Sequence, residues 1–244
     1  MRLHELRALY LVVFLGALTF ACSSKRSSRN GALPALTATA WLVPLPVAGF
    51  GEAKVAVPLG AQSARPLLIA IHGELDRPEW QCGSYRGISH GRSFILCPAA
   101  PPGAEESPRE LRGAISALKQ RFGAHLARGP VVLAALGPGV ERALSLALEE
   151  PSFFSHLVLV NGSLARLTPA FATRFGQAGG KRVLVVCSEG GCDPDSDIRV
   201  QSLRPPGVES RLIVPPKGQG LDADVASAIE KQWSWLVASD PRWR

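Results

Sequence analysis

The position best suited to a reactive side chain follows an apolar strand, at a sharp turn around residue 137. The segment 129–150 reads GPVVLAALGPGVERALSLALEE, in which an apolar run at Val131–Leu136 precedes Gly137-Pro138-Gly139 and then a helical pattern. A strand, a tight glycine turn and a helix is the arrangement in which a G-x-S-x-G motif exposes a nucleophilic serine. The serine position of that motif falls on Gly137, which has no side chain with which to attack a substrate.

The elements that would hold this turn alternate between strands and helices. We predict strands at 40–44, 53–57, 67–71, 93–96, 131–136, 156–161, 182–187 and 210–214, and helices at 84–90, from 107, from 139, at 168–175 and from 222. This alternation predicts an α/β fold with a mostly parallel sheet and helices on both faces. Binding sites of such sheets lie in the loops at the carboxyl ends of the strands. Those loops are His72–Cys82, Gly137–Gly139, Ser188–Asp197 and Pro215–Asp222.

In this order the loops resemble those of the α/β-hydrolase fold, in particular small lidless carboxylesterases and dienelactone hydrolases, over about residues 40–237. Only the segment 162–181 separates two strands where larger members insert a lid. The resemblance places the nucleophile on Gly137 and the base on Gln219. It places the acid on Asp193, which precedes a proline, with Asp195 as the alternative.

The resemblance also implies an oxyanion-type loop at His72, Gly73 and Glu74, completed by the amide of the residue after the nucleophile. That residue is Pro138, which has no amide hydrogen. Since Gln219 does not titrate, it cannot act as a general base. The resemblance therefore implies a degenerate site. It also implies a role in binding or scaffolding, in which the ligand is unidentified and no cofactor or metal takes part.

Several alternatives stay open at this point. The turn at Gly137 is also explained as an ordinary strand-to-helix connection, and the acidic run from Asp193 as a solvated loop. An active carboxylesterase-like serine hydrolase using other residues is the alternative function. Ser163 follows a strand but has no base near it in the sequence.

Four cysteines in the globular part, Cys82, Cys97, Cys187 and Cys192, allow three disulfide connectivities. Nearness in sequence favours Cys82–Cys97 and Cys187–Cys192. By the loop-entropy model these disulfides stabilise the folded state by about 3 and about 2 kcal/mol, respectively. Four free buried cysteines are the alternative. The spacings do not match the paired C-x2-C pattern of zinc sites.

Residues 1–22 are predicted to be a lipoprotein-type signal peptide. Two arginines precede the apolar run Ala8–Phe20, and Cys22 follows in a context that resembles a bacterial lipobox. By the same resemblance, Ser23 after the cysteine implies an outer-membrane lipoprotein. An ordinary signal peptide or an uncleaved anchor is the alternative.

Residues 23–39 are predicted to be a flexible tether and 40–244 the folded domain. The first 30 residues carry five basic residues and one acid, whereas the remainder carries 22 basic and 19 acidic residues, a net charge of +3. The sequence pI of about 9.5 therefore comes largely from the N-terminal segment, and no patch points to nucleic acid.

Cys22→Ala tests the predicted lipid anchor. The variant should leave the membrane fraction, because diacylated cysteine is what holds such a protein on a bilayer. Fractionation with immunoblotting measures this, and globomycin should have the same effect on the unmodified chain. Mature protein that begins elsewhere than Cys22 and carries no lipid would show that the anchor is assigned wrongly.

Overall fold

The computed structural model describes residues 32–73, 76–99, 107–188, 190–204, 207–215, 218 and 220–243. The predictions for the signal peptide with Cys22, for the tether up to residue 31, for Glu74 and for Gln219 lie outside these residues. Within the described ranges, no helix has the length and apolar character needed to cross a membrane.

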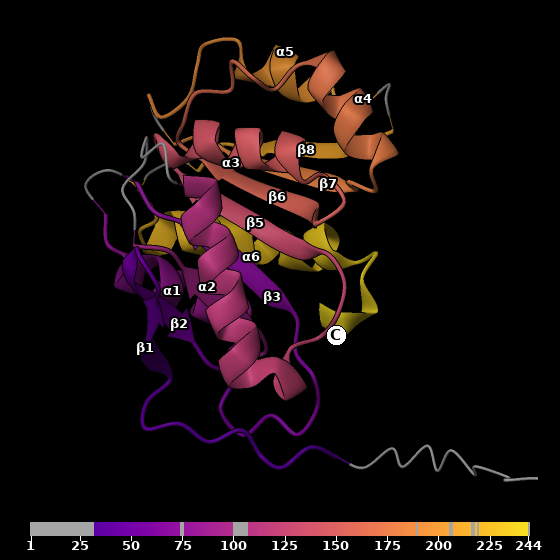
Figure 1. The fold of residues 1–244 in the computed structure, drawn as a ribbon. Coiled ribbons are helices and arrows are strands. Elements are labelled where there is room, and N and C mark those ends of the chain that lie inside the picture. Colours follow the sequence, from indigo (N-terminus) through magenta and orange to yellow (C-terminus); the bar gives the residue numbers. More distant parts are fainter. Residues whose placement is uncertain are drawn as a thin grey trace, which may run out of the picture. The chain divides into compact units, whose positions relative to one another are not determined.

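Eight strands form one sheet in the order β1-β2-β4-β3-β5-β6-β7-β8 (Figure 1). The hairpin β1–β2 and the pair β2–β4 are antiparallel, and all pairs from β4 to β8 are parallel. The predicted mostly parallel sheet is therefore confirmed. The strands are β1 Leu42–Val47, β2 Gly51–Ala56, β3 Leu67–Ile71, β4 Phe94–Cys97, β5 Val131–Leu136, β6 Phe154–Val160, β7 Arg182–Val186 and β8 Glu209–Ile213.

Helices cover both faces of the sheet, which confirms the predicted layering (Figure 1). Side chains of α1 and α6 pack into the core on one face, and side chains of α2, α3, α4 and α5 pack into the core on the other. The helices are α1 Pro78–Ile88, α2 Ser107–Phe122, α3 Gly139–Glu149, α4 Pro169–Gln177, α5 Ser196–Gln201 and α6 Ala223–Val237, with short 3-10 turns at Gly123–His125 and Pro241–Trp243.

The central strands are apolar at every position because each face is covered by helices. In β5, Val131, Leu133 and Ala135 point into the core beneath α2 and α3, whereas Val132 and Ala134 point toward α1 and α6. Successive side chains of a strand alternate between faces, so one continuous apolar run supplies both cores. The strand ends therefore meet at one edge, which positions the loops discussed below.

Three expectations need correction. The helix predicted at 84–90 is α1 and begins at Pro78, where proline occupies the first turn. The acidic segment expected as a loop contains α5, which starts at Ser196. The amides of Leu33 and Leu36, placed in the tether, bond to the carbonyls of Gln62 and Ala61, so contacts with the domain begin before residue 40.

Both predicted disulfides are formed. Cys82 of α1 is joined to Cys97 at the end of β4, and Cys187 after β7 is joined to Cys192. The first bond ties α1 to the sheet it covers. The second closes the loop that leads to Asp193, one of the predicted site residues.

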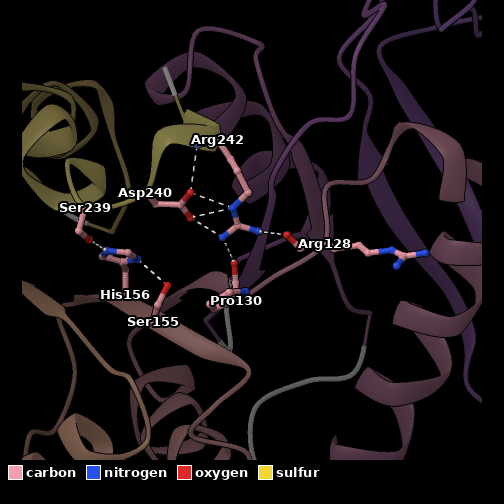
Figure 2. A network of polar contacts seen from close by, with 7 residues as sticks. All are labelled: Arg128, Pro130, Ser155, His156, Ser239, Asp240 and Arg242. Atoms are coloured by element: carbon pink, nitrogen blue, oxygen red, sulfur yellow. Dashed lines mark hydrogen bonds and ion pairs between the residues drawn. The ribbon is translucent and has the colours of Figure 1, made fainter. Parts of the chain in front are cut away.

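A buried histidine joins the start of β6 to the segment after α6 (Figure 2). The ring nitrogens of His156 lie 2.7 Å from Ser155 Oγ and 3.1 Å from Ser239 Oγ, and only 1% of the residue is exposed. Burial lowers the pKa of His156 to about 4. This serine–histidine pair lies buried near the amino end of β6, whereas the predicted site lies at the carboxyl ends of the strands. The pair is therefore a structural contact.

Arg242 also fastens the segment after α6, to which it belongs (Figure 2). Its guanidinium binds the Asp240 carboxylate and donates to the carbonyl oxygens of Arg128, at 2.8 Å, and Pro130, at 2.6 Å. These carbonyls lie just before β5. The C-terminal segment is thus fastened to the starts of both β5 and β6.

The free energy of unfolding should fall by about 3 kcal/mol between pH 7 and pH 4 through His156 alone. The unfolded histidine, with its usual pKa near 6.5, binds the proton more readily than the buried one. The contribution is therefore complete above about pH 6.5 and is lost as the pH falls toward 4. Urea titrations of the native protein and of His156→Gln at several pH values measure the free energy of unfolding. If that free energy changes equally with pH in the two proteins, the assignment is refuted.

Candidate functional site

The turn after β5 has the predicted geometry. Gly137 lies in the left-handed region at φ +56°, its amide donates to Val160 O at 2.8 Å, and its carbonyl accepts from Val140 N at 3.0 Å. A Cβ on Gly137 would lie no closer than 3.8 Å to any heavy atom, the nearest being Asn161 O. The backbone angle, and not a lack of space, is therefore what favours glycine here.

The backbones around this turn approach one another closely. A Cβ on Gly139 would lie 3.0 Å from Ile71 Cγ2 and 3.1 Å from His72 O, at the end of β3. A Cβ on Gly162 would lie only 2.3 Å from Gly137 O, which no real side chain allows. The turn is thus clamped between the ends of β3 and β6, and its conformation is set by the strands on either side.

The residues expected to stabilise an oxyanion offer little for that purpose. Pro138, at φ −57° and ψ −23°, precedes α3 and has no amide hydrogen to donate. His72 is buried, and because a carbonyl can only accept, its Nδ1 donates to Gly73 O at 2.8 Å. His72 Nε2 has no partner in the part of the chain that the structure describes. The ring thus belongs to the loop's own structure.

The structure brings the predicted nucleophile and acid positions together. Gly137 and Asp193 line one open pocket of about 400 Å³, together with Asn161 and Ser163. The Asp193 carboxylate accepts from Leu164 N at 2.9 Å and so holds the loop that follows β6. Asp195, the alternative acid, forms an ion pair with Arg199 at 2.8 Å on α5.

Asn161 also belongs to this site, although it was not among the predicted site residues. It has a left-handed backbone, at φ +47°, directly after β6. Its Oδ1 accepts from Ser188 N at 2.7 Å, and its Nδ2 donates to Ser188 Oγ at 2.6 Å and lies 3.5 Å from Gly220 O. Asn161 thereby ties together the ends of β6 and β7 and the loop that contains position 219. The Asn-Gly pair at a strand end was the signal available in the sequence.

A larger pocket of about 840 Å³ lies between the carboxyl ends of the strands and the start of α1, and we call it the α1 pocket. Leu136, Gly73 and the segment Gly220–Asp222 line it from the strand-end loops. Its other wall is formed by Trp41, by Asp76 just before α1, and by Glu79, Trp80 and Gln81 in the first turn of α1. Two of the four predicted loops therefore contribute to it, whereas Trp41 was not expected there.

His125 and His156 line neither of these two pockets. His125 lies in the 3-10 turn after α2 and donates to Pro34 O at 2.9 Å, and His156 lies in the buried contact described above. Within the described residues, no three His, Cys, Asp or Glu side chains are grouped as a metal site.

Comparison with solved structures identifies the fold. The S-formylglutathione hydrolase of Staphylococcus aureus matches with a TM-score of 0.62 at 14% identity, over 85% of this chain and 100% of that chain. A dienelactone hydrolase of Anabaena variabilis matches with a TM-score of 0.53 at 15% identity, over 82% and 96%. A thermophilic esterase of Thermogutta terrifontis gives 0.52 at 14% identity, over 81% and 99%.

These likenesses confirm the expected α/β-hydrolase fold. Between β6 and β7 the chain carries only α4 and its flanking turns, so no lid is evident there. No family model and no curated protein sequence matches the chain. At identities below 20% the structural likeness establishes the fold alone, and the site must be judged from its own residues.

Gly162→Ala tests the close approach at the turn. The added methyl would overlap Gly137 O, so the free energy of unfolding should fall by at least about 2 kcal/mol. Gly87→Ala is the control: it lies exposed on α1 with no atom within 4 Å of the new Cβ, and should raise stability by up to about 1 kcal/mol. Urea denaturation measures both, and equal stability of Gly162→Ala and the native protein would contradict the geometry.

Proposed function

We propose that this chain is a non-catalytic α/β-hydrolase-fold protein that binds a ligand at the carboxyl edge of its sheet. The observation that carries the proposal is the turn at Gly137-Pro138. It combines a left-handed residue without a side chain and a following residue without an amide hydrogen. Acyl transfer in this fold needs a nucleophile at the first position and an oxyanion donor at the second.

The magnitudes favour loss of catalysis over a weakened enzyme. Removing the nucleophile or the base of a triad lowers turnover by on the order of a million-fold. Removing one oxyanion donor costs a further 3–4 kcal/mol or so of transition-state stabilisation. The base position carries Gln219, which cannot exchange a proton near neutral pH.

What remains at the edge suits binding. The α1 pocket has the volume of a small-molecule site and is lined by aromatic, apolar and carboxylate side chains. We further propose that the domain is exported and held on a membrane, as an outer-membrane lipoprotein, through lipidated Cys22. The support is the sequence of residues 1–23, described above.

Ester hydrolysis tests the proposal. The purified protein should show no turnover of short p-nitrophenyl esters above the buffer rate. Gly137→Ser should remain inactive, since base and oxyanion donor would still be missing, and should lose about 1–3 kcal/mol of stability from strain at φ +56°.

Gly137→Ala is the matched control for that variant, because it imposes the same backbone strain without a hydroxyl. The two variants should be equal in stability and in residual rate. Turnover by the unmodified protein that a serine-directed inhibitor abolishes would refute the proposal and support an active serine hydrolase.

A further inference from the structure

The charged side chains that line the α1 pocket have one sign. Asp76, Glu79 and Asp222 line it, and among the described residues of its wall there is no lysine, arginine or histidine. This departs from the chain after residue 30, which carries 22 basic and 19 acidic residues, a net charge of +3. Arg77 and Arg86 are not part of this wall but lie over two tryptophans that line it, so the attraction for a cation is confined to the interior of the pocket, beside Asp76.

Asp76 is the carboxylate best placed to receive a cation. Its Oδ1 accepts from Arg77 N at 2.8 Å and its Oδ2 accepts from Gln81 Nε2, so its contacts are amides. No ion pair joins Asp76 to a basic side chain within the described ranges. Glu79, in contrast, lies 3.4 Å from Lys54 Nζ, which also binds Glu52 at 2.7 Å. Covering Asp76 with a neutral ligand would remove its solvation without balancing its charge.

Gln81 adds an acceptor that the protein leaves unused. The residue is 1% exposed, and because its Nε2 donates to a carboxylate, its Oε1 is left to accept. Gln81 Oε1 has no partner in the described structure. An unpartnered buried acceptor costs about 1–3 kcal/mol. Because Oε1 is itself buried, a small shift of the side chains around it lets a ligand hydrogen reach it and offset that cost.

Two tryptophans at the rim complete the pocket. Trp41 is 36% exposed and Trp80 is 60% exposed, which is unusual for so large an apolar side chain. Arg86 lies over the Trp41 ring at 5.1 Å from its centroid, and Arg77 over Trp80 at 5.5 Å. Each ring therefore already has an arginine as its cation, and the ring surface that stays exposed is available for apolar contact with a ligand.

We infer that the α1 pocket binds an organic cation, an ammonium or guanidinium group on an apolar body. The cationic group would lie at Asp76 with a hydrogen directed to Gln81, and the apolar body would lie between the two tryptophans. This rests on the proposed function, in that the edge of the sheet binds and does not react, and it adds the chemical class of the ligand.

Titration with three small probes tests the inference. Benzylamine, benzyl alcohol and benzoate share one ring and differ in charge, and calorimetry on the purified full-length protein at neutral pH gives each affinity. Benzylamine should bind at least tenfold more tightly than the other two, and added salt should weaken it because charge attraction is screened. Equal affinity for benzylamine and benzyl alcohol, or tighter binding of benzoate, would overturn the inference.

Variants locate the site. Asp76→Asn should weaken benzylamine at least tenfold and leave benzyl alcohol unchanged. Trp80→Ala should weaken the binding of both benzylamine and benzyl alcohol. Because Trp80 is exposed, this variant should stay folded, so it tests the site even if Asp76→Asn unfolds the start of α1. Glu150→Gln is the matched control and should not change binding. The Glu150 carboxylate pairs with Arg112 of α2 at the C-terminal end of α3, and neither residue lines the pocket. Benzylamine binding that survives both pocket variants would place the cation elsewhere and overturn the inference.

The outcomes separate this inference from the proposed function. Failure of benzylamine to bind, together with absent ester turnover, would refute the cation site and leave the non-catalytic assignment intact. Ester turnover would refute the non-catalytic assignment, whatever the titrations give.

Discussion

The crossing of backbones at the end of β5 is the constraint on which the rest of this edge depends. Gly162 lies so close to the carbonyl of Gly137 that a Cβ has no room. Gly139 lies against the end of β3, where a Cβ would be only 3.0 Å from Ile71 Cγ2. The left-handed residue between them joins a buried strand to a helix with a two-residue turn. The loops after β3, β5 and β6, which contribute to the two pockets, start from these clamped strand ends.

That constraint also explains how the fold accommodates a glycine at the turn where an active α/β-hydrolase carries its nucleophile. A serine at a nucleophile turn must be held in a strained backbone conformation, and such strain is kept where function requires it. With Gly137 the strain is relieved, and Pro138 presets the first turn of α3. Asp193 still has a structural task, because its carboxylate holds Leu164 N. The residues of this turn therefore have structural roles that do not require catalysis, in agreement with the proposed non-catalytic function.

The strands and the turn could be predicted because their signals are local. Buried strands such as β3 and β5 are continuous apolar runs, and Gly137-Pro138-Gly139 marks its own turn. Two helices were predicted to begin at Thr168 and Asp222, and these residues cap α4 and α6, where both side chains accept amide hydrogens. The start of α1 was missed because Arg77 makes no side-chain cap, which left Pro78 as the one local signal.

The α1 pocket and the histidine contact could not be predicted from local pattern. Trp41 and Trp80 meet at one rim only because β1 and α1 pack at the same edge of the domain, which depends on strand order. His156 and Ser239 are 83 residues apart, and neither belongs to a motif. A buried polar contact of this kind follows from which element covers which strand, so it becomes visible only in three dimensions.

Intact-protein mass spectrometry after incubation with a fluorophosphonate tests most directly whether the carboxyl edge holds a nucleophile. A known serine hydrolase treated in parallel shows that the reagent is active. We expect the mass of this protein to stay unchanged, because Gly137 presents no side chain and Ser163, in the same pocket, has no histidine beside it in the described structure. A stoichiometric adduct that peptide mapping assigns to a serine of the cleft, and that prior denaturation prevents, would contradict the non-catalytic assignment.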